Sequence, residues 1–349
     1  MAHIVLADDG IEFDGATPEN QPLGGAESSV VALMEELAAR GHEAIVVNKC
    51  RARLNHNGVS WRPIGEGDWP DMFPGDVDLY IANRGDKLLD AMPRARRTVF
   101  WIHNPARYLL KWRYLTKLWR IKPAIVFIGD YHAATYPGWA PDGGRVVIPY
   151  GIPEAFCKAG SLDQPPPPRA IFTSNPLRSL DWLLDLWAER IRPGVPGAEL
   201  HVFAGAATYG HVGEDKAARM ETVLSRARAM EASGVRLCDP VAKDRLIEEL
   251  RASRVMLYRG DLNETFCLAV GEAQAMGVPA VVENLGSVNE RVIDGETGFV
   301  ASDDATFAEA AVRLLGDDDL WRRQHRAALA RQRNWRWQQA AAAFEELIP

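Results

Sequence analysis

The chain has 349 residues, 47% hydrophobic and 25% charged, a composition typical of a globular protein and a length sufficient for two ordinary domains. Its formal net charge of −7 argues against a general nucleic-acid binder, so no nucleic-acid partner is expected. Four scattered cysteines without CxxC spacing indicate free thiols rather than a disulfide framework or a zinc site.

The N-terminal sequence lacks the basic segment and apolar run of a signal peptide. No apolar stretch approaches the roughly 20 residues that span a bilayer. We therefore expect a cytoplasmic protein that contacts a membrane, if at all, peripherally at the inner face of the cell membrane.

Short β-branched runs alternate with helical patterns in the first part of the chain. Residues 3–7 predict a buried strand, and the apolar spacing of residues 28–40 predicts a helix that Gly41 ends. Further strands are predicted at 44–48, 79–82, 99–102, 124–128 and 145–149. This alternation predicts a parallel sheet that is covered by helices on both faces.

A proline-rich segment then interrupts the pattern. The four prolines at 165–168 cannot continue a helix or a central strand, so the segment is interpreted as a stiff linker. Strands are predicted again at 170–173, 199–204, 235–237, 255–258 and 280–283. We therefore predict an α/β protein with two Rossmann-like domains and a ligand-binding cleft between them. The predicted segments are a domain at 1–155, a linker at 156–168, a domain at 169–330 and a C-terminal helix at 331–349.

Two glutamates stand out in the second half. Glu264 is predicted in a polar loop after a strand, and Glu272 in a helix over residues 266–276 that Gly277 closes. The free backbone N–H groups at the start of such a helix can bind phosphate. Glu272 could accept paired hydrogen bonds from a ribose diol, worth roughly 1.5–3 kcal/mol each. Either glutamate alone reads more simply as a solvated charge, but together with the apolar neighbours and the Gly-Val-Pro turn they indicate a site.

This stretch resembles the E-x7-E signature of retaining glycosyltransferases with the GT-B fold, and most resembles glycosyltransferase family 4. Four further segments agree in order and spacing. Residues 23–27 resemble the family's glycine-rich loop and residues 40–43 the end of its first helix. Residues 148–153 resemble its P-N-G-[IV] hinge, and residues 294–300 its late glycine turn. The similarity covers nearly the whole chain.

The resemblance implies a role for each matching residue. Glu264 would contact hydroxyls of the transferred sugar, and Glu272 would hold the donor ribose. Backbone amides near Phe266, Cys267 and Leu268 would meet the sugar or the diphosphate.

The first domain would contribute further contacts. Gly24 and Gly25 would let the first helix approach the phosphates closely, although a flexible turn explains the glycine pair equally well. His103, at the end of a strand, matches the family histidine that faces the sugar and is a candidate catalytic residue, with a structural role as the alternative.

The phosphate-binding region departs from the family pattern. Arg178 can stand in for the family's lysine, but the upstream arginine is missing and its place falls near Thr173. Cys267 replaces the usual glycine after the phenylalanine. These departures predict weaker diphosphate binding or an unusual donor.

The resemblance also implies the reaction. A hexose would pass, with retention of configuration, from a UDP- or GDP-sugar bound to the second domain to a glycan or lipid-linked acceptor near the first. No cofactor and no metal ion are implied. Asp76 and Asp78 have DxD spacing, but they precede a predicted strand and are interpreted as a loop boundary. The C-terminal helix would cross back and pack on the first domain.

A basic segment with tryptophans lies at residues 107–122. At helical spacing Trp112 and Trp119 share one stripe with Leu115, and a neighbouring stripe carries Arg113, Lys117 and Arg120. Aromatic anchors beside a basic row are typical of an interfacial helix on anionic lipid. The alternative is a core-packed helix whose charges are solvated.

Two other functions stay open. One is a nucleotide-sugar epimerase on the same fold. The other is a non-catalytic, membrane-associated sugar-binding protein, which the missing arginine suggests.

Overall fold

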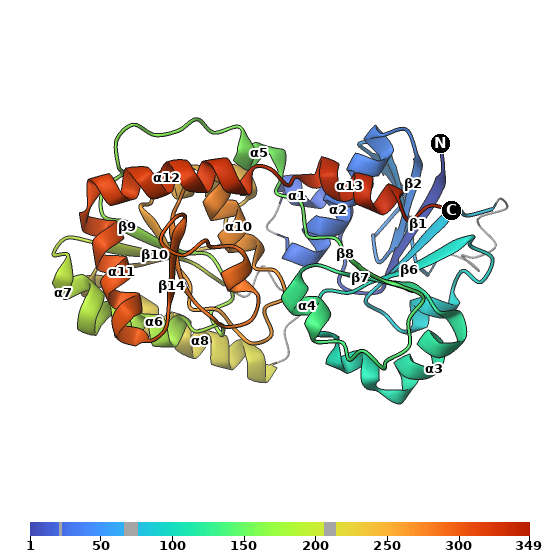
Figure 1. Cartoon of the computed structure of the whole chain (residues 1–349), viewed down its shortest axis with the longest axis horizontal. Coiled ribbons are helices and arrows are strands. Elements are labelled where there is room, and N and C mark those ends of the chain that lie inside the picture. Colours follow the sequence, from blue (N-terminus) through green and yellow to red (C-terminus); the bar gives the residue numbers. More distant parts are fainter. Residues whose placement is uncertain (21–22, 66–75, 206–213) are drawn as a thin grey trace. The chain divides into compact units, whose positions relative to one another are not determined.

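The computed structural model describes residues 1–20, 23–65, 76–205 and 214–349 (Figure 1). Contacts divide the chain into two compact units. Unit 1 comprises Met1–Gly151 and Trp335–Pro349, and unit 2 comprises Ile152–Asn334. The proline run at 165–168 therefore falls within the sequence of unit 2.

Unit 1 is built on one sheet, with eight strands among the described residues in the order β3-β4-β2-β1-β5-β6-β7-β8. All neighbours pair in parallel except β3 and β4, which are antiparallel. The strands are β1 (His3–Asp8), β2 (Glu43–Asn48), β3 (Leu54–His56), β4 (Val59–Pro63), β5 (Leu79–Asn83), β6 (Arg97–Trp101), β7 (Ala124–Phe127) and β8 (Arg145–Val147). The predicted parallel sheet is thus present.

The helices of unit 1 connect these strands and cover the sheet. They are α1 (Thr17–Asn20), α2 (Gly25–Ala39), α3 (Trp112–Ile121), α4 (Asp130–Ala134), α13 (Trp337–Glu345) and the short 3-10 helices η2 (Lys87–Asp90) and η3 (Ala106–Leu110).

The C-terminal helix returns to unit 1, as predicted. α13 packs against α2 (Figure 1). Its Trp337 and Phe344 are buried, and the Phe344 ring lies edge-on to Trp101 of β6 with 5.3 Å between ring centroids. The role of these aromatic side chains is therefore packing.

Unit 2 contains a second sheet, with six strands among the described residues in the order β11-β10-β9-β12-β13-β14 and every pairing parallel. The strands are β9 (Arg169–Phe172), β10 (Glu199–Phe203), β11 (Val235–Cys238), β12 (Val255–Leu257), β13 (Ala280–Glu283) and β14 (Gly298–Ala301). The helices are α5 (Glu154–Cys157), α6 (Leu180–Leu186), η4 (Trp187–Ile191), α7 (Arg192–Gly194), α8 (Glu214–Ala229), η6 (Glu231–Ser233), α9 (Lys243–Arg251), α10 (Leu268–Ala275), η7 (Val288–Glu290), α11 (Asp304–Gly316) and α12 (Asp318–Gln332).

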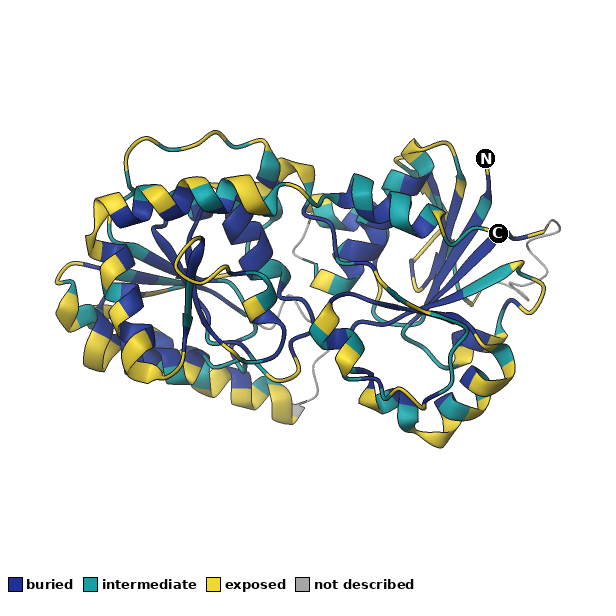
Figure 2. Ribbon diagram, viewed as in Figure 1, coloured by how far each residue is buried: buried dark blue, intermediate teal, exposed yellow. Residues whose placement is uncertain are grey.

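Each sheet forms the centre of its unit's core (Figure 2). β7 in unit 1 and β12 and β13 in unit 2 are buried at every residue. Continuous apolar runs of this kind are expected for parallel strands that are covered on both faces. The carboxyl ends of the strands consequently gather polar loops at one edge of each sheet.

Gly277 shows why a helix ends where the sequence predicts. It follows α10 with φ of +75°, a conformation that L side chains rarely adopt. A Cβ there would also lie 2.4 Å from His325 Nδ1 of α12. Only glycine therefore fits at this turn, which sets the register between α10, which carries Glu272, and α12.

Candidate functional site

Glu264 lies in the loop between β12 and α10 and is largely buried. Its Oε2 accepts a hydrogen bond from the hydroxyl of Tyr258 at 2.8 Å and pairs with the guanidinium of Arg178. Its Oε1 accepts from the backbone N–H of Cys267 at 3.2 Å. Three donors from three segments thus fix the carboxylate in place.

Arg178 reaches Glu264 from the segment between β9 and α6, and its side chain is about one third exposed. The following residue, Ser179, has φ of 62° and bonds the carbonyl of Gly260 at 3.2 Å. The structure thus brings the predicted phosphate-binding cation directly to the predicted sugar-binding carboxylate.

Glu272 is 2% exposed on α10 and is also paired with a cation. Lys243 Nζ, at the start of α9, lies 2.5 Å and 2.8 Å from its two carboxylate oxygens. Lys243 also lies 5.5 Å from the centroid of the Phe156 ring. A carboxylate offers about four acceptor positions, so Glu272 can receive a diol while Lys243 stays in contact.

Cys267 caps the N-terminus of α10 in a left-handed conformation, with φ of 62° and ψ of 67°. This region is costly for residues with a Cβ and cheap for glycine. Cys267 is buried. Burial, as the main cause, and the nearby Glu264 both raise the pKa of its thiol well above the usual value. The thiol therefore stays protonated. The strained residue stands directly before Leu268, the first residue of α10.

The Phe266 side chain is buried beneath a cation that the sequence analysis did not single out. The guanidinium carbon of Arg291 lies 4.4 Å from the centroid of the Phe266 ring. Arg291 therefore adds a positive charge beside the segment that carries Glu264 and Phe266.

His103 in unit 1 follows β6 and is buried in a polar network. Its Nε2 lies 2.5 Å from Oδ1 of Asn83, at the end of β5, and its Nδ1 bonds the hydroxyl of Tyr150. Burial, followed by the positive charge of Arg84, lowers the pKa of His103 well below its usual value, so the ring is neutral near pH 7.

Arg84 joins this network to β1 and α2. Its guanidinium lies 2.7 Å from Oδ2 of the fully buried Asp8 and 2.9 Å from Oε1 of Glu27. Arg84 has φ of 66°, so it shares the left-handed conformation of Ser179 and Cys267. Residues of this kind concentrate at functional sites. Among the described residues, five non-glycine residues have a positive φ, and these three of them lie around Glu264 and His103.

Gly24 precedes α2, and Gly25 is its first residue. Gly24 has φ of −61° and ψ of 155°, a conformation open to any residue. Backbone conformation therefore does not require glycine at this position. The close approach of the donor phosphates to Gly24 and Gly25 remains a prediction.

The basic helix predicted near residue 112 is α3. Trp112 and Trp119 are 78% and 74% exposed, whereas Tyr114 and Leu118 are buried against unit 1. The cations are largely matched by acids. Lys117 Nζ lies 2.7 Å from Asp90, which also pairs with Arg120, and Arg113 Nε lies 3.5 Å from Asp86. The exposed tryptophans, and not an unbalanced positive charge, therefore distinguish this surface.

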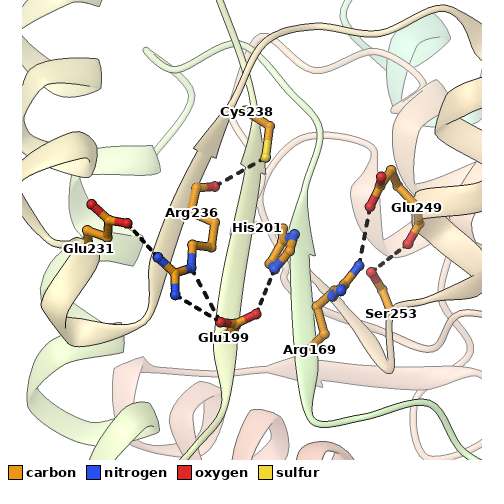
Figure 3. Close-up of polar contacts among 8 residues, drawn as sticks. All are labelled: Arg169, Glu199, His201, Glu231, Arg236, Cys238, Glu249 and Ser253. Carbon is orange, nitrogen blue, oxygen red and sulfur yellow. Dashed lines mark hydrogen bonds and ion pairs between the residues drawn. The ribbon is translucent and has the colours of Figure 1, made fainter.

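A second polar cluster in unit 2 lies on one face of β9, β10 and β11 (Figure 3). His201 Nε2 is 3.0 Å from Glu199, and Arg169 is 3.2 Å from Glu249. A hollow of about 560 Å³ lies beside it, and none of its described lining residues was predicted as a site residue. Because these charges pair with one another, we leave the cluster outside the candidate site.

Sequence reasoning missed several residues around Glu264 and Glu272 and in the His103 network. Lys243 begins α9, after the loop that follows β11, and a cation after the end of a parallel strand could have indicated a ligand-binding position. Asp8 and Asn83 are polar residues at the ends of apolar strands, where parallel sheets bind ligands. Arg84 follows one of them. Nothing in the sequence around Arg291 indicated its contact with Phe266.

Solved structures of known proteins share this fold over nearly the whole chain. Sucrose-phosphate synthase from Thermosynechococcus elongatus aligns with a TM-score of 0.76 and 16% identity, covering 99% of this chain and 98% of its own. HepE from Anabaena, solved with UDP and glucose, aligns with a TM-score of 0.73 and 16% identity over 99% of both chains. The protein therefore has the GT-B fold, as predicted.

The match to a family model lies in the second unit. Residues 168–317 match the family model of glycosyl transferases group 1. D-inositol 3-phosphate glycosyltransferase from Corynebacterium diphtheriae is 33% identical over 134 residues, 38% of this chain and 31% of the relative. Its counterpart in Nocardia farcinica is 29% identical over 175 residues, 49% of this chain and 38% of the relative.

These matches span about a third of the length of the curated relatives. The segment that carries Glu264 and Glu272 is nevertheless a glycosyl transferases group 1 sequence, which confirms the resemblance to glycosyltransferase family 4.

Proposed function

We propose that this protein is a retaining glycosyltransferase that moves a hexose from a nucleotide-diphosphate sugar to a glycan or lipid-linked acceptor in cell-surface polysaccharide or glycolipid synthesis. One observation carries the proposal. Glu264 and Glu272 are both buried and each is held by a cation from another segment, within the part of the chain that matches glycosyl transferases group 1.

In this reaction the bond between the anomeric carbon and the diphosphate oxygen breaks, and a bond to the acceptor oxygen forms. The proton of the acceptor hydroxyl passes to an oxygen of the departing diphosphate, which leaves with the electron pair of the broken bond. Arg178 is partly exposed and can turn from Glu264 toward the negative charge of that diphosphate. The N–H groups at the start of α10 add partial positive charge.

The individual roles follow the resemblance. Glu264 binds hydroxyls of the transferred sugar, and Glu272 binds the donor ribose. Backbone amides of residues 266–268 meet the sugar or diphosphate, and Gly24 and Gly25 allow the phosphates to approach α2. His103 faces the transferred sugar as a catalytic residue. No metal ion is required, so chelation by EDTA should leave transfer unchanged.

A nucleotide panel tests the donor. HepE was solved with UDP and glucose, which makes a UDP-sugar the first donor to try and a GDP-sugar the second. A bound nucleotide raises the unfolding temperature by mass action. We expect one of UDP, GDP and ADP to raise it in a saturable way. No shift with any of the three would contradict the proposal.

Two other functions are separated from this one by the products. An epimerase on the same fold would change the sugar without releasing nucleotide, whereas a transferase releases nucleotide when an acceptor is present. A non-catalytic sugar-binding protein would neither transfer nor hydrolyse any UDP-, GDP- or ADP-sugar. The missing family arginine is the observation that keeps this last alternative open.

We further propose that unit 1 contacts an anionic membrane surface through α3. The exposed Trp112 and Trp119 supply the anchors, and Arg113, Lys117 and Arg120 supply positive charge beside them. Because Asp86 and Asp90 balance part of this charge, we expect the tryptophans to provide most of the binding. Among the described residues, no helix is both long and apolar enough to cross a membrane.

A further inference from the structure

The buried network around His103 has a fixed direction of hydrogen bonding. It begins at Asp8, which is fully buried at the end of β1. The Asp8 carboxylate pairs with Arg84 at 2.7 Å and accepts from the backbone N–H of Gly10 at 2.7 Å. A carboxylate that pairs with an arginine accepts hydrogen bonds and does not donate them. Whatever else contacts Asp8 must therefore donate.

Asn83 is the next member of the network. Its Nδ2 donates to Asp8 Oδ2, which is the only orientation the carboxylate permits. The amide oxygen Oδ1 is then directed to His103 Nε2, at 2.5 Å. Because an amide oxygen only accepts, His103 must carry its proton on Nε2.

The proton on Nε2 also determines the hydrogen-bonding role of Nδ1. A neutral imidazole with a proton on Nε2 has an acceptor at Nδ1. The hydroxyl of Tyr150 is bonded to Nδ1 and must donate to it. Tyr150 is buried and lies one residue before the end of the first segment of unit 1 at Gly151.

We propose that Asp8 and Asn83 are positioning residues that hold His103 as the tautomer with hydrogen on Nε2, and that the Tyr150 hydroxyl occupies Nδ1 until substrate replaces it. The last clause rests on the function proposed above. A sugar hydroxyl that uses His103 must displace Tyr150 and must donate its hydrogen to Nδ1. His103 thus accepts a hydrogen bond from the sugar hydroxyl and does not donate one to it.

Histidine-selective ¹⁵N labelling tests the tautomer without any substrate, so its outcome does not depend on the transferase activity. Long-range ¹H–¹⁵N correlation spectra distinguish the two neutral tautomers, and the His103→Gln variant identifies the His103 signals among the eight histidines. We expect the pattern of a protonated Nε2 in the unmodified protein. A protonated Nδ1 would overturn the proposal.

Asp8→Asn tests the origin of the tautomer. An asparagine at position 8 can donate, so the Asn83 amide is free to turn and His103 should populate the second tautomer measurably. Glu27→Gln is the matched control, because it also removes a carboxylate from Arg84 but leaves Asn83 in place, and it should leave the tautomer unchanged. If Asp8→Asn fails to fold, Asn83→Ala makes the same test. An unchanged tautomer in the folded variant would overturn the positioning role.

Discussion

Lys243 Nζ lies 2.5 Å and 2.8 Å from the two carboxylate oxygens of Glu272. The carboxylate is almost wholly buried, whereas the lysine side chain is 38% exposed. The pair therefore brings together a buried acceptor and a partly exposed cation. Both residues lie within the segment that matches glycosyl transferases group 1. This combination suits a ribose attached to a diphosphate.

Removal of Lys243 should weaken both the fold and the site. Lys243→Met leaves the Glu272 carboxylate without its described cation, and we expect a loss of about 1–3 kcal/mol in the free energy of unfolding, because Glu272 is buried. Urea denaturation measures this loss. The double variant Lys243→Met/Glu272→Gln removes the unpaired charge and should recover part of it. Additive losses in the double variant would contradict the assigned pairing.

A side chain at position 267 should lower the stability of the folded protein relative to glycine, because the backbone there is left-handed. Cys267→Ala keeps the Cβ in the left-handed region, whereas Cys267→Gly removes it. We expect the glycine variant to exceed the alanine variant by about 1 kcal/mol in the free energy of unfolding. Comparing these two variants cancels the loss of the thiol, which they share. An alanine variant that is equally stable or more stable would show that the position is not strained.

Stability should fall in acid below pH 6.5. Burial lowers the pKa of His132 from 6.5 to about 4, and its ring nitrogens bond the N–H of Ile128 and the carbonyl of Asn104. The unfolded chain binds this proton more readily, so the contribution is complete above pH 6.5 and is lost as the pH falls toward 4. The loss should approach about 3 kcal/mol.

The His132→Gln variant tests this pH dependence. It should reduce, without abolishing, the dependence of the unfolding free energy on pH between pH 6.5 and 4, because glutamine does not titrate whereas His103, whose pKa is also lowered, still does. An unchanged slope in His132→Gln would contradict the account, because other groups would then cause the loss of stability in acid.

Membrane binding should depend on the two exposed tryptophans of α3. The Trp112→Ala/Trp119→Ala variant should lose at least tenfold in co-sedimentation with vesicles that contain anionic lipid, with no change in stability. Trp139 is 73% exposed in unit 1 and lies outside α3, so Trp139→Ala is the matched control and should bind normally. Equal binding by the two variants would exclude α3 as the contact.

Charge and apolar contact can be separated with the same assay. Because Asp90 pairs with Lys117 and Arg120, Asp90→Asn should increase binding to anionic vesicles and leave binding to neutral vesicles unchanged. Equal binding of the unmodified protein to neutral and anionic vesicles would contradict the electrostatic part of the proposal.

Much of the fold could be predicted because parallel strands buried on both faces leave continuous apolar runs. The runs at 44–48 and 280–283 correspond to β2 and β13. β3 and β4 were missed because the sequence Leu-Asn-His is largely polar and Val-Ser-Trp-Arg-Pro ends in proline. β14 begins with Gly298, so only its glycine turn was recognised.

The candidate site was predicted less completely than the fold. Glu264 and Glu272 could be found because they lie on one continuous segment with a known spacing. Their partners Arg178 and Lys243 lie on different elements, and only tertiary structure shows which cation faces which carboxylate. The same holds for Asp8, whose role depends on Asn83, 75 residues away in the sequence.

The most direct test of the proposed donor site is calorimetric titration of the nucleotide identified by the panel into the unmodified protein and Glu272→Gln. Glu249→Gln is the control, because Glu249 likewise pairs with a cation of unit 2, Arg169, but belongs to the separate cluster beside β9–β11 (Figure 3). We expect Glu272→Gln to raise the Kd at least tenfold while staying folded, and Glu249→Gln to leave it unchanged. An unchanged Kd in Glu272→Gln would contradict the ribose-binding role on which the proposed function depends.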